Sequence, residues 1–334
     1  MTAATDSVER TLEVCEARRL NDLVRLIRLA APDQTTLPTW APGSHLLVQV
    51  TLADGSTDWR HYSLIDLDGE QGDAVSGPTT YTIAVRREDD GRGGSLFMHE
   101  KLNAGDTLTI QGPINNFPLE ECAGTTLLLA GGIGITPLAS MAANCSATGK
   151  PVEMHYAGRS RSLMAFTDEL EALLGDSLHI HADDEHDGAF YDITQVLDRC
   201  GPQDRLYVCG PKPVLDNVLA ATEARQWEDH RVSFEVFTDP VVEEGDHAFE
   251  VVLAESGDTF TVPADKTILE CLIERGHDPL YDCTRGECGV CTTDVLEGEI
   301  DHRDYVLTQS EKDSGEVMQI CVSRAKGDKL VLDL

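Results

Sequence analysis

Three cysteines lie within nine residues in the segment CTRGECGVC, at 283–291, and no other feature constrains this chain as strongly. Four residues separate Cys283 from Cys288, and two separate Cys288 from Cys291. A fourth cysteine, Cys321, follows in MQICVSRA. This is the plant-type spacing of a [2Fe–2S] cluster, which is held by four thiolates. The glycines between the cysteines allow a tightly wrapped loop, because glycine tolerates unusual backbone angles. We therefore predict that these four cysteines are metal ligands.

A structural zinc site is the main alternative for these thiols. Zinc sites normally use paired C-x2–4-C units at both ends of the site, whereas Cys321 stands alone. Disulfides fit less well, because the first residues, MTAATDSVER, are polar and do not resemble a secretory signal. Most of the six scattered cysteines are expected to be small buried apolar side chains. These observations favour a cytoplasmic iron–sulfur protein.

The charge excludes two classes of partner. The chain has 26 basic and 59 acidic residues, which gives a formal net charge of −33. Such a surface repels nucleic acids and anionic membranes. It either steers a basic protein partner or serves as a solubilising, salt-adapted surface. The long apolar stretch that begins TLLLAGG contains several glycines and Pro137, so we expect a buried strand, loop and helix start rather than a membrane span.

The pattern of apolar residues predicts three domains in the 334 residues. Residues 1–117 contain short alternating runs, such as LVRLIRLA at 23–30 and YTIAVRRE at 81–88, which favour an antiparallel β-barrel. Residues 118–237 alternate apolar strands with helical segments, which is typical of a parallel α/β sheet. Residues 238–247 are acidic and contain a proline, which predicts a linker. Residues 248–334 form a small α+β domain that carries the cysteines.

Two segments of the first domain could hold a flavin. In RHYSLID (60–66), Arg60 and Tyr62 share a strand face, and Ser63 adds a hydroxyl; together they offer a cation, a ring and a polar group. In GRGGS (91–95), a glycine-rich turn enters a helix, where backbone amides can bind phosphate. Arg86 is a candidate charge partner for that phosphate. An ordinary strand and a plain surface loop are the alternatives.

Two loops of the second domain could approach a dinucleotide. AGGIGITP (130–137) follows a buried strand, and its glycines allow a nucleotide to come close to the backbone. The glycines do not match G-x-G-x-x-G, so the ordinary dinucleotide fingerprint is not met. YVCGPKP (207–213) repeats the arrangement after another apolar strand. Because parallel strands end at one edge of a sheet, both loops are expected at the ligand-binding edge.

These motifs occur in one order, and on them the chain resembles the phthalate dioxygenase reductase family, which includes vanillate demethylase reductases. The resemblance rests on RHYSL, IAVRRE with GRGGS, NNFPL, AGGIGITP, YVCGP, FEVF, CTRGECGVC, DHRDYVLTQSEK and ICVSRAKGDKLVLDL. It implies an FMN-binding barrel of the ferredoxin-reductase superfamily, an NADH-binding α/β domain and a plant-type ferredoxin domain of the β-grasp kind.

The resemblance also implies roles for individual residues. The flavin would be held by Arg60, Tyr62 and Ser63, with its phosphate at Arg86, Gly93, Gly94 and Ser95. The nicotinamide cleft would be formed by Gly131, Gly132, Gly134, Thr136, Cys209, Gly210 and Pro211, and Phe237 would cover the flavin ring. The predicted catalytic residues among these are Ser63, Thr136, Cys209 and Phe237. The insertion at 66–80 is long for the hairpin after RHYSL.

Two local features bear on the choice between NADH and NADPH. Arg159 or Arg161 in GRSRS could meet a 2′-phosphate. Asp183 in HADDEHD could bind the ribose diol and repel that phosphate. The family and the local acidity favour NADH, and a solvated loop is the alternative for all three residues.

The resemblance implies the reductase component of a two-component Rieske-type oxygenase or demethylase, in aromatic catabolism. NADH would reduce FMN, and electrons would pass singly through the [2Fe–2S] cluster to a terminal oxygenase. The chain itself has no Rieske Cys/His pairs. Three alternatives stay open: a P450 or diiron monooxygenase as acceptor, an iron–sulfur carrier or redox sensor that does not oxidise NADH, and a zinc-stabilised α/β protein.

Overall fold

The structure is a computed structural model that describes residues 8–33, 35–67, 77–237, 242–243 and 245–334. Contacts divide the chain into two compact units, Met1–Glu235 and Val236–Leu334. The first unit contains two sheets and the second contains one larger sheet with a two-stranded ribbon. The predicted domain boundaries at 117 and 247 remain predictions. Part of the predicted linker, 238–241 and 244, lies outside the described residues.

Six antiparallel strands form the first sheet, in the order β4-β3-β6-β1-β2-β5. They are β1 (Arg10–Arg19), β2 (Val24–Ala30), β3 (His45–Thr51), β4 (Thr57–Ser63), β5 (Thr80–Arg86) and β6 (Thr107–Ile114). A bridge between Leu64 and Ile83 joins the two ends of the sheet, so it closes into a barrel. Alternate side chains, such as Val48 and Ile110, fill its buried interior. Helix α1 (Gly94–Glu100) contacts β3 and β5.

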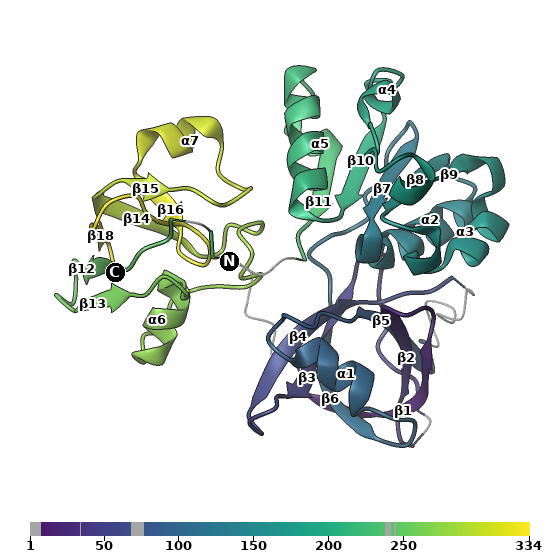
Figure 1. Ribbon diagram of the computed structural model, residues 1–334, viewed down its shortest axis with the longest axis horizontal. Coiled ribbons are helices and arrows are strands. Elements are labelled where there is room, and N and C mark those ends of the chain that lie inside the picture. Colours follow the sequence, from purple (N-terminus) through teal and green to yellow (C-terminus); the bar gives the residue numbers. More distant parts are fainter. Residues whose placement is uncertain (1–7, 34, 68–76, 238–241, 244) are drawn as a thin grey trace. The chain divides into compact units, whose positions relative to one another are not determined.

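Five parallel strands form the second sheet, in the order β11-β10-β7-β8-β9. They are β7 (Thr126–Gly131), β8 (Val152–Gly158), β9 (Leu178–Ala182), β10 (Arg205–Cys209) and β11 (Val232–Glu235). Helices α2 (Ile135–Thr148) and α3 (Thr167–Leu174) pack together, as do α4 (Thr194–Leu197) and α5 (Lys212–Ala224), with the sheet between the two pairs (Figure 1). Strand β7 is buried along its whole length, which explains its continuous apolar sequence.

A buried serine joins the barrel to the parallel sheet. Ser140, in α2, donates from Oγ to the Leu64 carbonyl at 2.8 Å and accepts from the Asp66 amide at 3.1 Å. Both partners come directly after the strand that carries RHYS. The junction therefore fixes the end of β4 against the helix that follows the AGGIG loop.

The second unit has a mixed sheet in the order β13-β12-β18-β14-β16, with the pair β15-β17 beside it. Its elements are β12 (Phe249–Leu253), β13 (Thr259–Val262), α6 (Ile268–Glu274), β14 (Thr292–Glu297), β15 (Ile300–Asp301), α7 (Gln309–Ser314), β16 (Val317–Gln319), β17 (Arg324–Ala325) and β18 (Lys329–Leu332). Helix α6 begins at a capping box, in which Thr267 and Glu270 satisfy each other's amides. The three predicted architectures, an antiparallel barrel, a parallel α/β sheet and an α+β domain, are confirmed.

Candidate flavin, nucleotide and iron–sulfur sites

The four predicted ligand cysteines gather in the second unit as two pairs. The thiols of Cys283 and Cys288 interact with each other, and so do those of Cys291 and Cys321. The Cys288 thiol stabilises the Cys283 thiolate and lowers the pKa of Cys283 to about 5, while the pKa of Cys288 rises. Three of the four side chains are buried, and Cys288 is half-buried. This sulfur set suits two irons, because each pair offers two thiolates to one metal ion.

The backbone around these thiols suits a cluster as well. The Arg285 amide donates to Cys283 Sγ at 3.3 Å, so the loop turns N–H groups toward sulfur. Gly286 has φ 76°, and a Cβ there would lie 2.7 Å from Val322 Cγ2 and 3.1 Å from Asp304 Cα. No larger residue fits at this position without displacing its neighbours. The glycine therefore holds the loop against the segment that precedes α7.

Glu287, between two of the cysteines, has a structural role that the sequence did not indicate. Its carboxylate accepts from the Val236 amide at 2.6 Å. Burial raises the pKa of Glu287 to about 7. The side chain therefore fastens the cysteine loop to the first residue of the second unit. The adjacent Phe237, predicted to cover the flavin, belongs to this unit too, and its role stays a prediction.

The structure brings the two predicted flavin segments together at Arg60 and Gly94. A Cβ on Gly94 would lie 2.8 Å from Arg60 Nε, so the guanidinium packs directly over the glycine turn. Arg60 donates to the Trp59 carbonyl at 2.9 Å and pairs with Asp58. The residue that precedes the helix, Gly93, has φ 82°. A cation and a glycine turn thus meet where the flavin phosphate is predicted.

Two polar atoms in RHYS are buried with no hydrogen-bond partner among the described residues: Arg60 Nη2 and Ser63 Oγ. Burying an unpartnered polar atom is costly, so such atoms indicate a missing ligand. The strand register opposes Arg60 to Val48 and Tyr62 to Leu46, which places these two predicted residues on one face, as expected. Ser63 occupies the alternate position, on the other face. The orphaned atoms fit a bound flavin.

Arg86 and Ser95 are engaged elsewhere. Arg86 Nη1 lies 2.9 Å from Glu88 Oε1, and Ser95 Oγ accepts from the Glu88 amide at 3.0 Å. Glu88 therefore engages two of the four residues that the resemblance assigns to the flavin phosphate. This contact could not be predicted from the sequence, because an acidic residue two positions after Arg86 is typical of a solvated loop.

The two predicted nucleotide loops meet at the ends of β7 and β10, which are neighbours in the sheet. A Cβ on Gly134 would lie 2.1 Å from the Cys209 carbonyl oxygen, and one on Gly131 would lie 2.8 Å from Pro211 Cδ. Only glycine permits this approach. The interlocked loops form the carboxyl edge of the sheet, where open α/β folds bind ligands. Cys209 is fully buried beneath them.

Other predicted residues of this edge lie within the same loops. Thr136 is buried and donates from Oγ1 to the Ile133 carbonyl at 3.0 Å, which stabilises the turn that enters α2. Gly132 has φ 56°, and a Cβ there would meet no atom within 4 Å, so its surface is open. Gly210 lies against Gly131, with a Cβ distance of 3.1 Å to the Gly131 Cα.

The residues predicted to set the choice between NADH and NADPH lie directly after β8 and β9. The Asp184 amide donates to the Arg159 carbonyl at 3.1 Å, so the loops after β8 and β9 are joined. Asp183 Oδ1 lies 3.5 Å from His181 Nε2. Arg161 is engaged by two carboxylates, Glu185 at 3.0 Å and Glu171 at 3.5 Å. An Arg161 held by acidic groups is a weak receptor for a 2′-phosphate.

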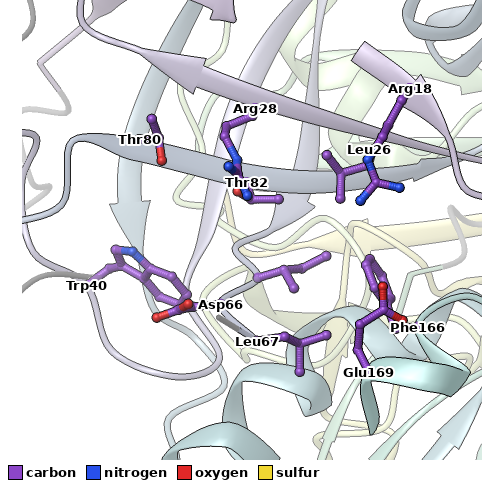
Figure 2. A pocket seen from close by; sticks show the side chains of 11 residues that line it. Arg18, Leu26, Arg28, Trp40, Asp66, Leu67, Thr80, Thr82, Phe166 and Glu169 are labelled. Atoms are coloured by element: carbon purple, nitrogen blue, oxygen red, sulfur yellow. The ribbon is translucent and has the colours of Figure 1, made fainter. Parts of the chain in front are cut away.

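A pocket in the first unit adjoins the RHYSLID segment: Ile65 and Asp66 line it, whereas Arg60, Tyr62 and Ser63 do not. Figure 2 shows Trp40, Asp66, Thr82 and Phe166 around it, with Arg28 above. It opens between the outer face of the barrel and the start of α3. Asp66, Leu67 and Thr80 of the predicted insertion at 66–80 line it, and residues 68–76 of that insertion lie outside the described residues.

Two family models match the chain. A model described as oxidoreductase FAD-binding domain matches residues 11–118, and one described as 2Fe-2S iron-sulfur cluster binding domain matches residues 251–326. The second match includes all four ligand cysteines and settles the choice between zinc and iron–sulfur in favour of the cluster. No helix among the described residues has the length and apolar character needed to cross a membrane.

Curated relatives match along almost the whole chain. The tetrachlorobenzoquinone reductase of Sphingobium chlorophenolicum is 39% identical and covers 100% of both chains. The phthalate 4,5-dioxygenase reductase subunit of Pseudomonas putida is 38% identical over 92% of this chain and 91% of its own.

Two solved structures are similar to this chain along 98% of its length. Phthalate dioxygenase reductase, whose structure is described as modular for electron transfer from pyridine nucleotides to [2Fe–2S], has a TM-score of 0.73 and 34% identity over 98% of both chains. The full-length P450 CYP116B46 of Tepidiphilus thermophilus has a TM-score of 0.70 and 38% identity. This chain spans only 42% of that P450.

Proposed function

The chain belongs to the phthalate dioxygenase reductase family, and on that premise we propose that it is the NADH-dependent reductase component of a Rieske-type oxygenase. Like its family, it is a flavin- and iron–sulfur-dependent oxidoreductase that takes electrons from NAD(P)H. The finer assignments, FMN as the flavin, NADH as the donor, the site residues and the oxygenase partner, are parts of the proposal. A cytoplasmic location is part of it too, since thiolate ligands need a reducing compartment.

The observation that carries the proposal is the coexistence of three sites on one chain. The buried cysteine pairs, the Arg60–Gly94 contact and the interlocked Gly134–Cys209 loops each suit one step of electron transfer from a pyridine nucleotide to iron. When bound, the flavin and the cluster supply the redox chemistry, by accepting two electrons together and releasing them singly. The chain binds and orients these groups, and no acid–base triad is needed.

Each site has a defined task in this proposal. Arg60 and the turn at Gly93–Ser95 hold the flavin phosphate, and Ser63 donates to the flavin. The choice of FMN rests on the resemblance to the phthalate dioxygenase reductase family. Gly131 and Gly134 let the two loops interlock at the strand ends, and the open surface at Gly132 lets nicotinamide approach. The four cysteine thiolates hold the two irons.

The acceptor is the least constrained element. The relative named as a phthalate 4,5-dioxygenase reductase subunit supports a separate oxygenase partner. The match to 42% of a P450 chain favours a second candidate, a P450 acceptor. Reconstitution decides between them. The reduced protein is mixed with a purified Rieske-type oxygenase or with a P450, and we expect rapid reoxidation of its cluster only by the Rieske protein. Reoxidation only by the P450 would replace the proposed partner.

The flavin is tested separately. We expect the flavin released by heat to migrate as FMN in chromatography, with one equivalent for each chain. Release of FAD would overturn this part of the proposal and leave the electron-transfer function in place.

A further inference from the structure

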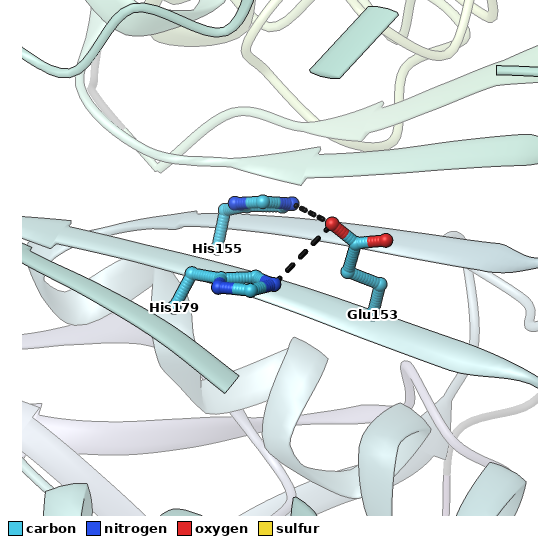
Figure 3. A group of neighbouring side chains, drawn as sticks. All are labelled: Glu153, His155 and His179. Carbon is cyan, nitrogen blue, oxygen red and sulfur yellow. Dashed lines mark hydrogen bonds and ion pairs between the residues drawn. The ribbon is translucent and has the colours of Figure 1, made fainter. Parts of the chain in front are cut away.

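Three side chains on the parallel sheet, none of them among the predicted redox residues, come together. His155 Nε2 lies 2.9 Å from Glu153 Oε1, and His179 Nε2 lies 3.4 Å from the same oxygen (Figure 3). The three nearest ligand atoms all lie within 4.8 Å of one another. Two ligands of a tetrahedral zinc ion, each about 2.0–2.1 Å from the metal, are roughly 3.3 Å apart. The oxygen–nitrogen distances already approach this spacing.

The sheet register creates the cluster. Glu153 and His155 alternate along β8, so their side chains share one face, while the neighbouring Met154 faces the other. The parallel pairing of β8 with β9 places His155 directly opposite His179. The two imidazoles stack, with ring centroids 4.7 Å apart, and Figure 3 shows them turning the same edge toward the carboxylate.

A second set of contacts orients the buried histidine. His155 is 3% exposed, and its Nδ1 lies 2.6 Å from the Tyr191 hydroxyl. Histidines that bind metals usually use their other ring nitrogen in such a hydrogen bond, which fixes the ring and directs the free nitrogen at the ion. Here the free nitrogen is Nε2, which faces Glu153.

We propose that Glu153, His155 and His179 form a binding site for one divalent transition-metal ion, for which Zn²⁺ is the best match. Two imidazoles and one carboxylate are a zinc ligand set, and water would complete the tetrahedron. The site is separate from the cysteine pairs, and the inference does not depend on the proposed redox function. The ion can enter from solvent, because Glu153 and His179 also line an open hollow with Asp176 and Ser177.

Binding requires two small movements at exposed side chains. A metal lies in the plane of each imidazole that binds it, so the His179 ring must tilt out of its stack; its side chain is 47% exposed and free to turn. Arg199 Nη2 lies 3.1 Å from Glu153 Oε1 and competes with a cation for that oxygen. Because Arg199 is 63% exposed, it can swing into water when the ion binds.

The test uses the full holoprotein and zinc itself. Zinc is titrated against a chelator of known affinity, the bound metal is counted by elemental analysis, and the visible spectrum verifies that flavin and cluster remain intact. We expect one zinc ion per chain. Removing a ligand with His179→Ala should weaken binding at least about tenfold, since even indirect partners of a zinc ligand contribute about that much.

Two further variants make the result specific. Arg199→Ala should bind zinc more tightly than the wild type, because it removes the competing cation. His230→Ala is the matched control, since His230 also lies 3.4 Å from a glutamate, Glu228, but is in no metal-ligand group of the residues that the structure describes; this variant should bind zinc like the wild type. Wild-type affinity in His179→Ala, weaker binding in Arg199→Ala, or zinc uptake only when the cluster is lost would each overturn the proposal.

Discussion

Gly134 presses against Cys209 so closely that a Cβ on the glycine would lie 2.1 Å from the cysteine's carbonyl oxygen. This contact locks the AGGIG loop to the end of β10. Gly134→Ala must push the two strand ends apart. We expect it to lower the free energy of unfolding by about 1–3 kcal/mol, the usual cost of overpacking, and to weaken NADH binding. Denaturant unfolding and NADH titration measure the two effects.

A matched control for this substitution is Gly201→Ala, in the same domain. Its added Cβ would meet only Asp204 Oδ2, at an ordinary 3.6 Å. We expect this variant to bind NADH like the wild type. Equal NADH affinity in both alanine variants would contradict the assignment of the Gly134 loop to the nucleotide.

Arg60 is expected to be the main charge partner of the flavin phosphate. Arg60→Ala should weaken flavin binding about 10–100-fold, because hydrogen bonds to charged groups contribute roughly 1.5–3 kcal/mol. Arg60→Lys should recover only part of this loss, because the planar fork is absent. Flavin retained after dialysis, measured by absorbance, gives the comparison. Arg18→Ala removes an exposed arginine paired with Glu16 and should retain full flavin occupancy.

Asp183 is expected to set the preference for NADH. Its carboxylate would repel a 2′-phosphate, so Asp183→Asn should raise kcat/KM for NADPH relative to NADH by about tenfold, which corresponds to ~1.4 kcal/mol. Steady-state reduction of an artificial acceptor measures the ratio. Asp184→Asn changes the exposed neighbour and should leave the ratio unchanged. An equal change of this ratio in both variants would mean that the loss of any negative charge in the loop, and not the position of Asp183, causes the effect.

Asp246 and Arg303 form an ion pair that stabilises the second unit. Asp246 Oδ1 lies 2.5 Å from Arg303 Nη2, and the Asp246 side chain is 6% exposed. The hydrogen bond from Arg303 lowers the pKa of Asp246 to about 2, below its ordinary value of 3.8. A carboxylate whose pKa is depressed on folding stabilises the protein fully above the higher value, and this stabilisation is lost as the pH falls from about 4 to about 2.

The lowered pKa of Asp246 predicts how a substitution there changes stability with pH. Asp246→Asn should lower the free energy of unfolding at pH 7 by about 2 kcal/mol, and the difference from wild type should disappear near pH 2. Urea unfolding of the cluster-free protein, followed by circular dichroism, tests both points. Asp313→Asn, which changes an exposed aspartate in the same unit, should unfold like the wild type at both pH values. A difference that persists at pH 2 would rule out the ion pair as its source.

Strands and helices with strong periodicity could be predicted from the sequence. The alternating run at 23–30 forms β2, and the continuous apolar run after Thr125 forms β7. A strand buried on one face alternates apolar and polar residues, whereas a strand buried on both faces is apolar throughout. The Ser-Gly-Asp sequence at 256–258 predicts a turn between two strands, and it joins β12 to β13 with Gly257 at φ 74°. The glycines of both nucleotide loops could also be predicted, because a nucleotide can come close to the backbone only where a residue has no side chain.

Contacts between distant side chains could not be predicted in this way. Glu153 and His179 are brought together by the register of β8 and β9, and no local pattern encodes the register of two parallel strands. Glu287 reaches the Val236 amide across 51 residues. These side chains read as surface charges in the sequence, and only the fold gives them partners.

The most direct measurement is an anaerobic NADH titration of the holoprotein, followed by visible absorbance and by EPR of the frozen samples. We predict bleaching of the flavin band and a reduced [2Fe–2S] signal. In Cys321→Ser the EPR signal should be absent while flavin bleaching persists, and in Cys271→Ala, which changes a buried core cysteine, both should persist. An unchanged flavin band, or a wild-type EPR signal in Cys321→Ser, would contradict an electron path from NADH through flavin to this cluster.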